Sequence, residues 1–236
     1  MLSFIVPAHN EEQHLPATLV AIRHSAEATG ELFEIIVVDD SSTDRTAEIA
    51  RAAGARLVSV QHRQISATRN AGARAAQGEI LFFVDADTQP TPAAVQAGLD
   101  ALRSGAVGGG CIFTFDGVLP LWARCLYPLA VLGARTLRLI GGCFLFCTRS
   151  AFDAVGGFSE KYFAAEEAAF IRALQRHGRF VIPRPTVVTS GRKLRAHSPR
   201  ELLGIAWSWA VRGPQHFQKR DGLEIWYGER TPDRLD

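Results

Sequence analysis

The N-terminal part of the chain alternates between short apolar runs and segments with helical periodicity. Leu15, Leu19, Ile22 and Ala26 recur at the spacing of one helix face. Runs of β-branched and aromatic residues, typical of strands buried in a parallel sheet, occupy residues 4–8, 34–38, 56–60 and 80–84. This alternation predicts right-handed crossovers and an α/β fold with a mostly parallel, doubly wound sheet.

Local signals mark the ends of several predicted helices. Thr91 followed by Pro92 combines an N-cap with an N1 proline, which is a strong start signal. Residues 44–53 read as a helix with Thr43 as its N-cap and Gly54 as its stop. An alanine-rich helix is expected at 65–77, ending before Gly78.

The second half of the chain is less regular. Strands are expected at 109–115 and 143–147, on either side of a helical segment, and a helix near 166–177. No repeat, low-complexity tract or linker interrupts the chain. We therefore expect a single domain over residues 1–236, with a change of character near residue 105.

Composition excludes some classes of protein. The formal net charge of +2 gives no sign of nucleic-acid binding. Four cysteines, without C-x-x-C spacing, favour reduced structural thiols and the cytoplasm: Cys111, Cys125, Cys143 and Cys147. The first residues do not resemble a signal peptide, and the apolar stretch between Arg124 and Arg135 is shorter than the roughly 20 residues of a spanning helix.

Acidic residues follow three of the predicted strands. Glu11 follows the first, Asp39 and Asp40 the second, and Asp85 and Asp87 the fourth. Ligands of open parallel sheets bind beyond the carboxyl ends of the strands. An Asp pair separated by one residue offers hard oxygen ligands for Mg²⁺ or Mn²⁺, although such pairs on surface loops are usually only solvated. Asp39 and Asp40 could instead cap the next helix, but two carboxylates exceed what a cap requires.

Four motifs occur together in a recognisable order: IVPAHNEE, EIIVVDDSSTDRT, ATRNAGARAAQGEILFFVDADT and GGF-x₇-EE. In this order and spacing they resemble the family-two glycosyltransferases over residues 3–180. The resemblance implies the GT-A fold. It also implies transfer of a sugar, with a hexose expected, from a UDP- or GDP-sugar with inversion at the sugar carbon. Residues 1–105 would then form the nucleotide- and metal-binding half, and residues 106–236 the acceptor half.

The resemblance also assigns roles to residues on the donor side. Pro7, His9 and Glu11 would neighbour the nucleotide, and Asp39 or Asp40 would contact the base or ribose. Asp85 and Asp87 would be the DXD pair that holds the metal and diphosphate. Arg69 would face the same site, although an exposed position on its helix is an equal alternative.

On the acceptor side, the family places a catalytic acid in an E-D pair after a GGF segment. Here Glu166 and Glu167 occupy that place, with Glu167 where the family has aspartate. The longer side chain changes the reach of the carboxylate, and two acids at a helix N-terminus could merely complement its dipole. We interpret Glu167 as the general base.

A basic stretch, TSGRKLRAHS, follows the last predicted strand. It could fold over the diphosphate as a lid, with Arg192 and Lys193 contacting phosphate and His197 as a third metal ligand. The alternative is a solvated loop.

The segment 119–140 is rich in leucine and aromatic residues. Arg124, Arg135 and Arg138 are spaced to share a helix face, and Pro128 would kink a continuous helix. An interfacial helix at the inner face of the membrane would suit a polyprenyl-phosphate or other lipid acceptor. A helix partly buried under the acceptor loop is the favoured interpretation.

Two other classes remain. A sugar nucleotidyltransferase, like a dehydrogenase or methyltransferase, needs glycines after the first strand, where this chain has PAHNEE. A non-catalytic nucleotide-sugar-binding protein could keep the nucleotide pocket without the base.

Overall fold

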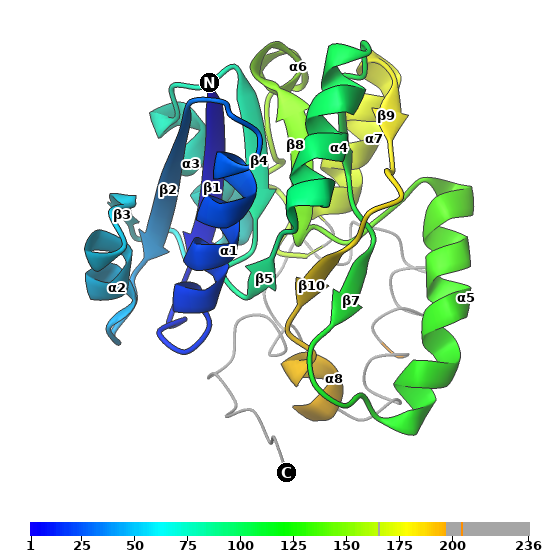
Figure 1. Ribbon diagram of the computed structural model, residues 1–236, viewed down its shortest axis with the longest axis horizontal. Coiled ribbons are helices and arrows are strands. Elements are labelled where there is room, and N and C mark those ends of the chain that lie inside the picture. Colours follow the sequence, from blue (N-terminus) through cyan, green and yellow to red (C-terminus); the bar gives the residue numbers. More distant parts are fainter. Residues whose placement is uncertain (165, 197–203, 205–236) are drawn as a thin grey trace.

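The computed structural model describes residues 1–164, 166–196 and 204 (Figure 1). Its main element is a seven-stranded sheet in the order β3-β2-β1-β4-β8-β6-β9. Only β8 runs antiparallel to its neighbours. The strands are β1 (Leu2–Ala8), β2 (Phe33–Asp40), β3 (Arg56–Val60), β4 (Ile80–Val84), β6 (Gly108–Gly110), β8 (Phe144–Thr148) and β9 (Phe180–Val181).

Helices cover both faces of this sheet. Consecutive residues of β1 point to opposite faces, so that Phe4 packs into one apolar core and Ile5 into the other. The first core lies under α1 (Leu15–Glu27), α2 (Thr46–Ala52) and α4 (Pro92–Arg103), and the second under α3 (Ile65–Ala75), α6 (Arg149–Val155) and α7 (Glu166–His177). Gly72 allows α3 to approach the sheet, because an added Cβ would lie 2.4 Å from the Ile5 side chain.

A small second sheet lies beside the end of β4. It has the order β5-β10-β7 and consists of β5 (Thr88–Gln89), β10 (Val187–Thr189) and β7 (Phe113–Phe115). β10 is antiparallel to β5 and parallel to β7. This sheet carries α8 (Arg192–Ala196) to the side of the molecule where β4 ends (Figure 1).

The predicted doubly wound α/β sheet is confirmed, as are its first four strands and the α4 start, where Thr91 Oγ1 accepts a hydrogen bond from the Ala94 amide. Two local predictions are wrong. Residues 109–115 form strands in two different sheets rather than one, because the chain leaves the main sheet after Gly110. Thr43 does not cap α2; Asp44 accepts a hydrogen bond from the Thr46 amide instead.

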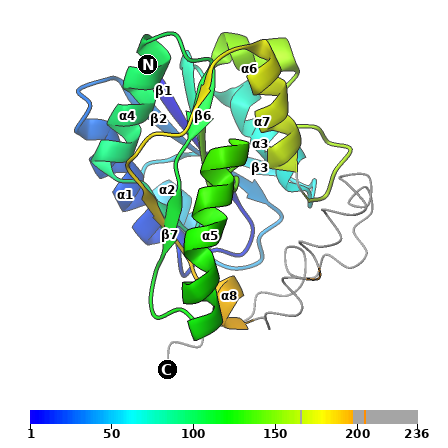
Figure 2. The same ribbon diagram turned by 90° about the vertical axis from the view of Figure 1, so that its right-hand side faces the viewer.

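Helix α5 (Leu121–Leu137) stands at one side of the molecule (Figures 1 and 2). Ala123 is its only buried residue, and Tyr127, Val131 and Ala134 are half-buried, so the helix is partly buried as expected; its cover by an acceptor loop stays a prediction. The helix continues through Pro128 and ends at Leu137. Arg138, which follows, adopts a left-handed backbone conformation and donates to the Phe180 carbonyl oxygen at 3.0 Å. In the described part of the chain, none of the helices has the length and hydropathy needed to cross a bilayer.

Candidate active site

The carboxyl ends of three strands meet at one edge of the main sheet. Ala8, at the end of β1, lies opposite Asp39 of β2. Ile5 lies opposite Phe83 of β4, which places Asp85 beyond the end of β4 at the same edge. The register of β1 with β2 and with β4 therefore brings the acidic strand ends together, as the sequence predicts. We call this region the carboxyl edge.

The two aspartates that end β2 have different surroundings. The Asp40 carboxylate accepts hydrogen bonds from the backbone amides of residues 62–64 and from Thr68 Oγ1, at 2.8 to 3.2 Å. It thereby fixes the loop that leads into α3. Asp39 accepts one bond, from the Ser42 amide at 3.2 Å. Asp39 consequently has more acceptor capacity for a ligand, whereas Asp40 shapes the loop beside it.

The loop after β1 is held against β2. His9 Nδ1 lies 2.8 Å from the Asp40 carbonyl oxygen, and the Arg63 guanidinium contacts the imidazole ring. Pro7 is buried within β1. The Glu11 amide donates to Thr46 Oγ1 at 2.8 Å, which anchors this turn on α2.

Arg192 joins the ends of β1 and β4. Its Nη1 and Nη2 donate to the two carboxylate oxygens of Glu11 at 2.9 and 2.7 Å, and Nη2 also donates to Asp87 Oδ2 at 2.9 Å. The Glu11 side chain is only 4% exposed, so this two-pronged contact neutralises a buried carboxylate.

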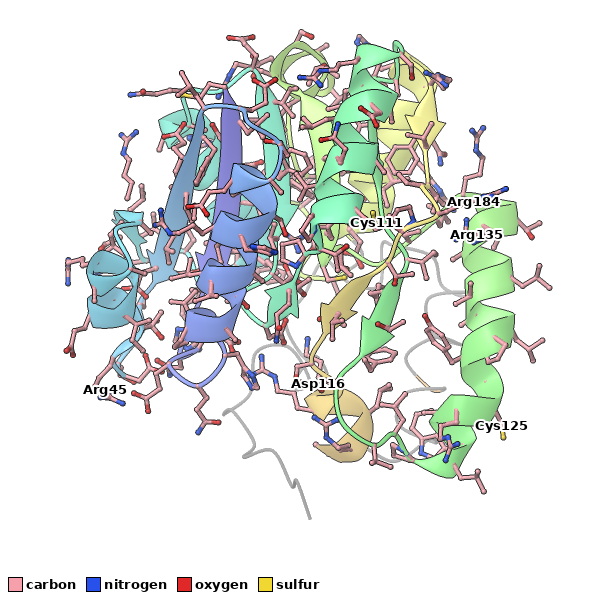
Figure 3. The ribbon with its side chains drawn as sticks, in the orientation of Figure 1. Arg45, Cys111, Asp116, Cys125, Arg135 and Arg184 are labelled. Carbon is pink, nitrogen blue, oxygen red and sulfur yellow. The ribbon has the colours of Figure 1, made fainter. Side chains whose placement is uncertain are left out.

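The small sheet positions Arg192. Thr189 of β10 pairs with Thr88 of β5, and their hydroxyls lie 2.8 Å apart. The next amide, that of Ser190, donates to the Asp87 carbonyl oxygen. Asp116 accepts from the Gly191 amide and from Arg195, and so fixes the first turn of α8. The location of Asp116 beside α8 is visible in Figure 3.

Arg69 forms the second charged centre. It is 2% exposed and donates to Asp85 Oδ1 at 2.7 Å, to Glu166 Oε1 at 2.9 Å and to the Gly142 carbonyl oxygen at 3.2 Å. The structure places Arg69 against Asp85 and buries it, so the alternative of an exposed helix residue is wrong; its role toward a nucleotide stays a prediction. An added Cβ at Gly142 would lie 3.1 Å from both Arg69 Nη2 and Glu167 Cβ, which shows how closely these groups pack.

The pKa of Glu166 is raised to about 8. Burial is the main cause, and the neighbouring charge of Glu167 adds to it. Arg69 opposes this rise, but its charge is shared with Asp85. Glu166, the first residue of α7, holds Arg69 in place by the hydrogen bond that it accepts, whereas Glu167 beside it is only half-buried.

The carboxylates of Asp85 and Asp87 fit a hard divalent cation. Burial raises the pKa of the Cys143 thiol, and the charges of Asp85 and Asp87 raise it further, so both carboxylates lie near this thiol. Asp85 forms an ion pair with Arg69 through Oδ1, and Asp87 forms one with Arg192 through Oδ2. Mg²⁺ commonly binds one or two carboxylates and completes its shell with phosphate and water. Within the described residues, no group of three or more His, Cys, Asp or Glu side chains is placed to hold a metal.

The remaining predicted residues of the basic stretch have mixed outcomes. Lys193 lies in α8 and is half-buried. His197, the predicted third metal ligand, lies outside the described residues. Arg192 does reach the carboxyl edge, but its contacts there are carboxylates. The sequence did not predict the roles of Asp116 and Gly142. For Gly142 the available signal was the Gly141-Gly142 pair just before a strand.

Known proteins resemble this chain in sequence and in structure. A model of the glycosyl transferase family 2 matches residues 3–155. The chain belongs to this family. Among its relatives, an undecaprenyl-phosphate 4-deoxy-4-formamido-L-arabinose transferase from Pseudomonas aeruginosa is 31% identical over 144 residues, which cover 56% of this chain and 41% of the relative. A 4,4'-diaponeurosporenoate glycosyltransferase from Staphylococcus haemolyticus is 38% identical over 37% of this chain and 24% of its own length. The chain thus spans less than half the length of each of these two relatives.

The fold of family 2 is also seen in solved structures. A mannosyltransferase from Pyrobaculum calidifontis, in complex with GDP-Man and Mn²⁺, has a TM-score of 0.67 to this chain at 21% identity. The alignment covers 89% of this chain and 64% of that one. The GT-A fold predicted from the sequence is therefore confirmed.

Proposed function

We propose that this family-two protein transfers a hexose from a UDP- or GDP-sugar to an acceptor hydroxyl or phosphate, with inversion at the sugar carbon. The observation that carries the proposal is the meeting of Glu11, Asp39, Asp85 and Asp87 at one carboxyl edge, with Arg69 and Arg192 between them. Membership of glycosyl transferase family 2 supports it.

Donor binding falls to the ends of β1, β2 and β4. Asp39 has acceptor capacity for base or ribose hydroxyls, beside the turn formed by Pro7 and His9. Asp85 and Asp87 would hold Mg²⁺ or Mn²⁺. A bound divalent cation would offset the charge that develops on the departing diphosphate.

The chemical step exchanges one bond to the sugar carbon for another. An acceptor oxygen attacks that carbon from the face opposite the diphosphate, and the carbon–oxygen bond to the diphosphate breaks. Glu167 takes the proton when the acceptor is a hydroxyl. Arg192 and Lys193 on α8 would interact with the leaving diphosphate once a cation neutralises Asp87.

Two other activities fit less well. The glycine-rich phosphate loop of a nucleotidyltransferase is not found after β1, because that turn has no glycine and is held by the His9 side chain and the Glu11 amide. A non-catalytic binding protein would keep the donor site alone. Glu166 and Glu167 lie at the start of α7, and Glu166 accepts a hydrogen bond from Arg69. These two acids favour an enzyme over a binding protein.

The experiment is a screen of UDP- and GDP-sugars with Mn²⁺ and with hydroxyl and phosphate acceptors, in which free nucleoside diphosphate and glycosylated acceptor are both measured. Equal amounts of the two products are expected. Donor binding, seen as thermal stabilisation, without product under all conditions would favour the binding protein instead.

We also propose that the protein works in the cytoplasm, in peripheral contact with the inner face of the membrane. On α5, Leu121, Leu129 and Leu132 are exposed beside Arg124 and Arg135, a combination suited to an anionic bilayer surface.

Flotation with phosphatidylglycerol vesicles tests this contact. The Leu129→Gln/Leu132→Gln variant should lose vesicle binding, whereas the equally exposed Val20→Gln control on α1 should keep it. Failure of the unaltered protein to float would exclude the contact.

A further inference from the structure

A cavity of about 320 Å³ lies between α5 and β7. Its walls include the aromatic side chains of Phe113, Phe115, Trp122 and Tyr127, and nearly all of the exposed lining is apolar. Phe115 packs edge-on against both Phe113 and Tyr127, and Tyr127 Oη donates to the Phe113 carbonyl oxygen at 2.6 Å. The polar group of the tyrosine is thus satisfied within the wall, which leaves a surface suited to hydrocarbon.

The cavity shares two wall segments with the carboxyl edge. Leu194 lines it from α8, two residues from Arg192. Gly141 lines it from the loop before β8, and the carbonyl oxygen of its neighbour Gly142 accepts from Arg69. A molecule in the cavity can therefore present one end to the guanidinium groups that contact Asp85 and Asp87.

The surroundings of the cavity are basic as well as apolar. The charge of Arg135 on α5 acts on Tyr127 in the wall and on the buried Cys111 next to it. Beyond the cavity, α5 continues as the exposed leucine surface described above. An elongated apolar ligand with an anionic end matches this arrangement of charge and hydrocarbon.

We propose that this cavity binds the hydrocarbon chain of a polyprenyl phosphate acceptor, whose phosphate end then lies at the carboxyl edge. The proposal rests on the proposed glycosyl transfer and names its acceptor. It agrees with the name of the Pseudomonas aeruginosa relative, which acts on undecaprenyl phosphate. The phosphate oxygen would attack the sugar carbon as the bond to the diphosphate breaks, and no proton needs to be removed from a dianionic phosphate.

Calorimetric titration with farnesyl phosphate, dimethylallyl phosphate and inorganic phosphate, without donor, tests the chain-binding role. The unaltered protein should bind farnesyl phosphate at least about tenfold more tightly than dimethylallyl phosphate, because only the longer chain fills the cavity. Ala130 lines the cavity and is exposed, so Ala130→Trp should reduce the ratio to below about threefold without disturbing the core.

Cys125→Trp is the matched control. Cys125 is exposed on α5, does not line the cavity and projects from the outer side of the helix (Figure 3). This variant should keep the ratio of the unaltered protein. A ratio near one in the unaltered protein, or a ratio unchanged by Ala130→Trp, would overturn the proposal.

A second readout separates this proposal from the proposed function. Thermal stabilisation by UDP or GDP with Mn²⁺ should be the same in Ala130→Trp, Cys125→Trp and the unaltered protein, because the cavity lies outside the donor contacts. If farnesyl phosphate binds more tightly than dimethylallyl phosphate but neither UDP nor GDP stabilises the protein, the proposed sugar donor is contradicted and the role of the cavity is not. The reverse result would contradict the cavity assignment alone.

Discussion

Arg192 Nη2 lies 2.9 Å from Asp87 Oδ2 although the two residues are 105 positions apart. The same guanidinium binds both oxygens of the buried Glu11. In this state an arginine supplies the positive charge next to Asp87. A metal-bound donor would supply it in the active complex.

Arg192→Ala should destabilise the protein by about 3 kcal/mol, because it leaves the carboxylate of Glu11 buried and unpaired. Urea unfolding measures this change. Arg45→Ala is the control, since Arg45 pairs with Glu12 at the exposed surface and should cost less than about 1 kcal/mol. Equal losses in the two variants would contradict the structural role of Arg192. Addition of Mg²⁺ should restore part of the stability of Arg192→Ala.

Asp87→Asn should remove the effect of metal on nucleotide binding. An amide is a poorer ligand for Mg²⁺ or Mn²⁺ than a carboxylate, so the extra thermal stabilisation that Mn²⁺ gives with UDP or GDP should be lost. Thermal unfolding with nucleotide, with and without Mn²⁺, is the measurement. Asp100→Asn on α4 is a control, because the Asp100 carboxylate accepts a hydrogen bond from Gln96 at the exposed surface of the same helix. Retention of the Mn²⁺ effect in Asp87→Asn would exclude this residue as a ligand.

Glu167→Gln should lower kcat by about 10²–10⁴ with a hydroxyl acceptor, the range of general-base catalysis, while donor affinity stays unchanged. With farnesyl phosphate at pH 7.5 the loss should be below about tenfold, because a phosphate monoester has already lost its second proton near pH 6. Both kcat values come from product formation at saturating acceptor. Equal losses with both acceptors would show that Glu167 positions groups rather than removing a proton.

Glu166 should make stability depend on pH. A carboxyl whose pKa is higher in the folded chain than in the unfolded chain binds its proton more tightly when folded, so its contribution is complete below about pH 4.5 and is lost as pH rises towards 8. Unfolding free energy should therefore fall more steeply over this range in the unaltered protein than in Glu166→Gln, by more than about 1 kcal/mol. Parallel profiles would contradict the raised pKa.

Much of the donor half follows from sequence, because long apolar strands have a clear pattern. The runs at β1, β2 and β4 predict the sheet, and the carboxylates after them predict the carboxyl edge. The burial of Arg69 does not follow from the sequence, because it depends on Glu166, which approaches from α7, 97 positions away.

The acceptor half was harder to predict for physical reasons. Strands β5 and β10 have two and three residues, too few to show a periodicity, yet they place Arg192 beside Asp87. Strand β6 is three consecutive glycines and carries no apolar signal. The leucines of α5 suggest burial by composition alone, whereas they are exposed in the structure.

The small sheet also has a dynamic consequence. Because β10 pairs over two residues with β5 and over three with β7, detaching β10 together with α8 breaks fewer backbone bonds than opening the seven-residue pairing of β1 with β2 and its further pairing with β4. Local opening is cheapest where such bonds are few. The amide of Ser190 should therefore exchange with deuterium much faster than that of Val37, because this short segment can open while the main sheet stays closed.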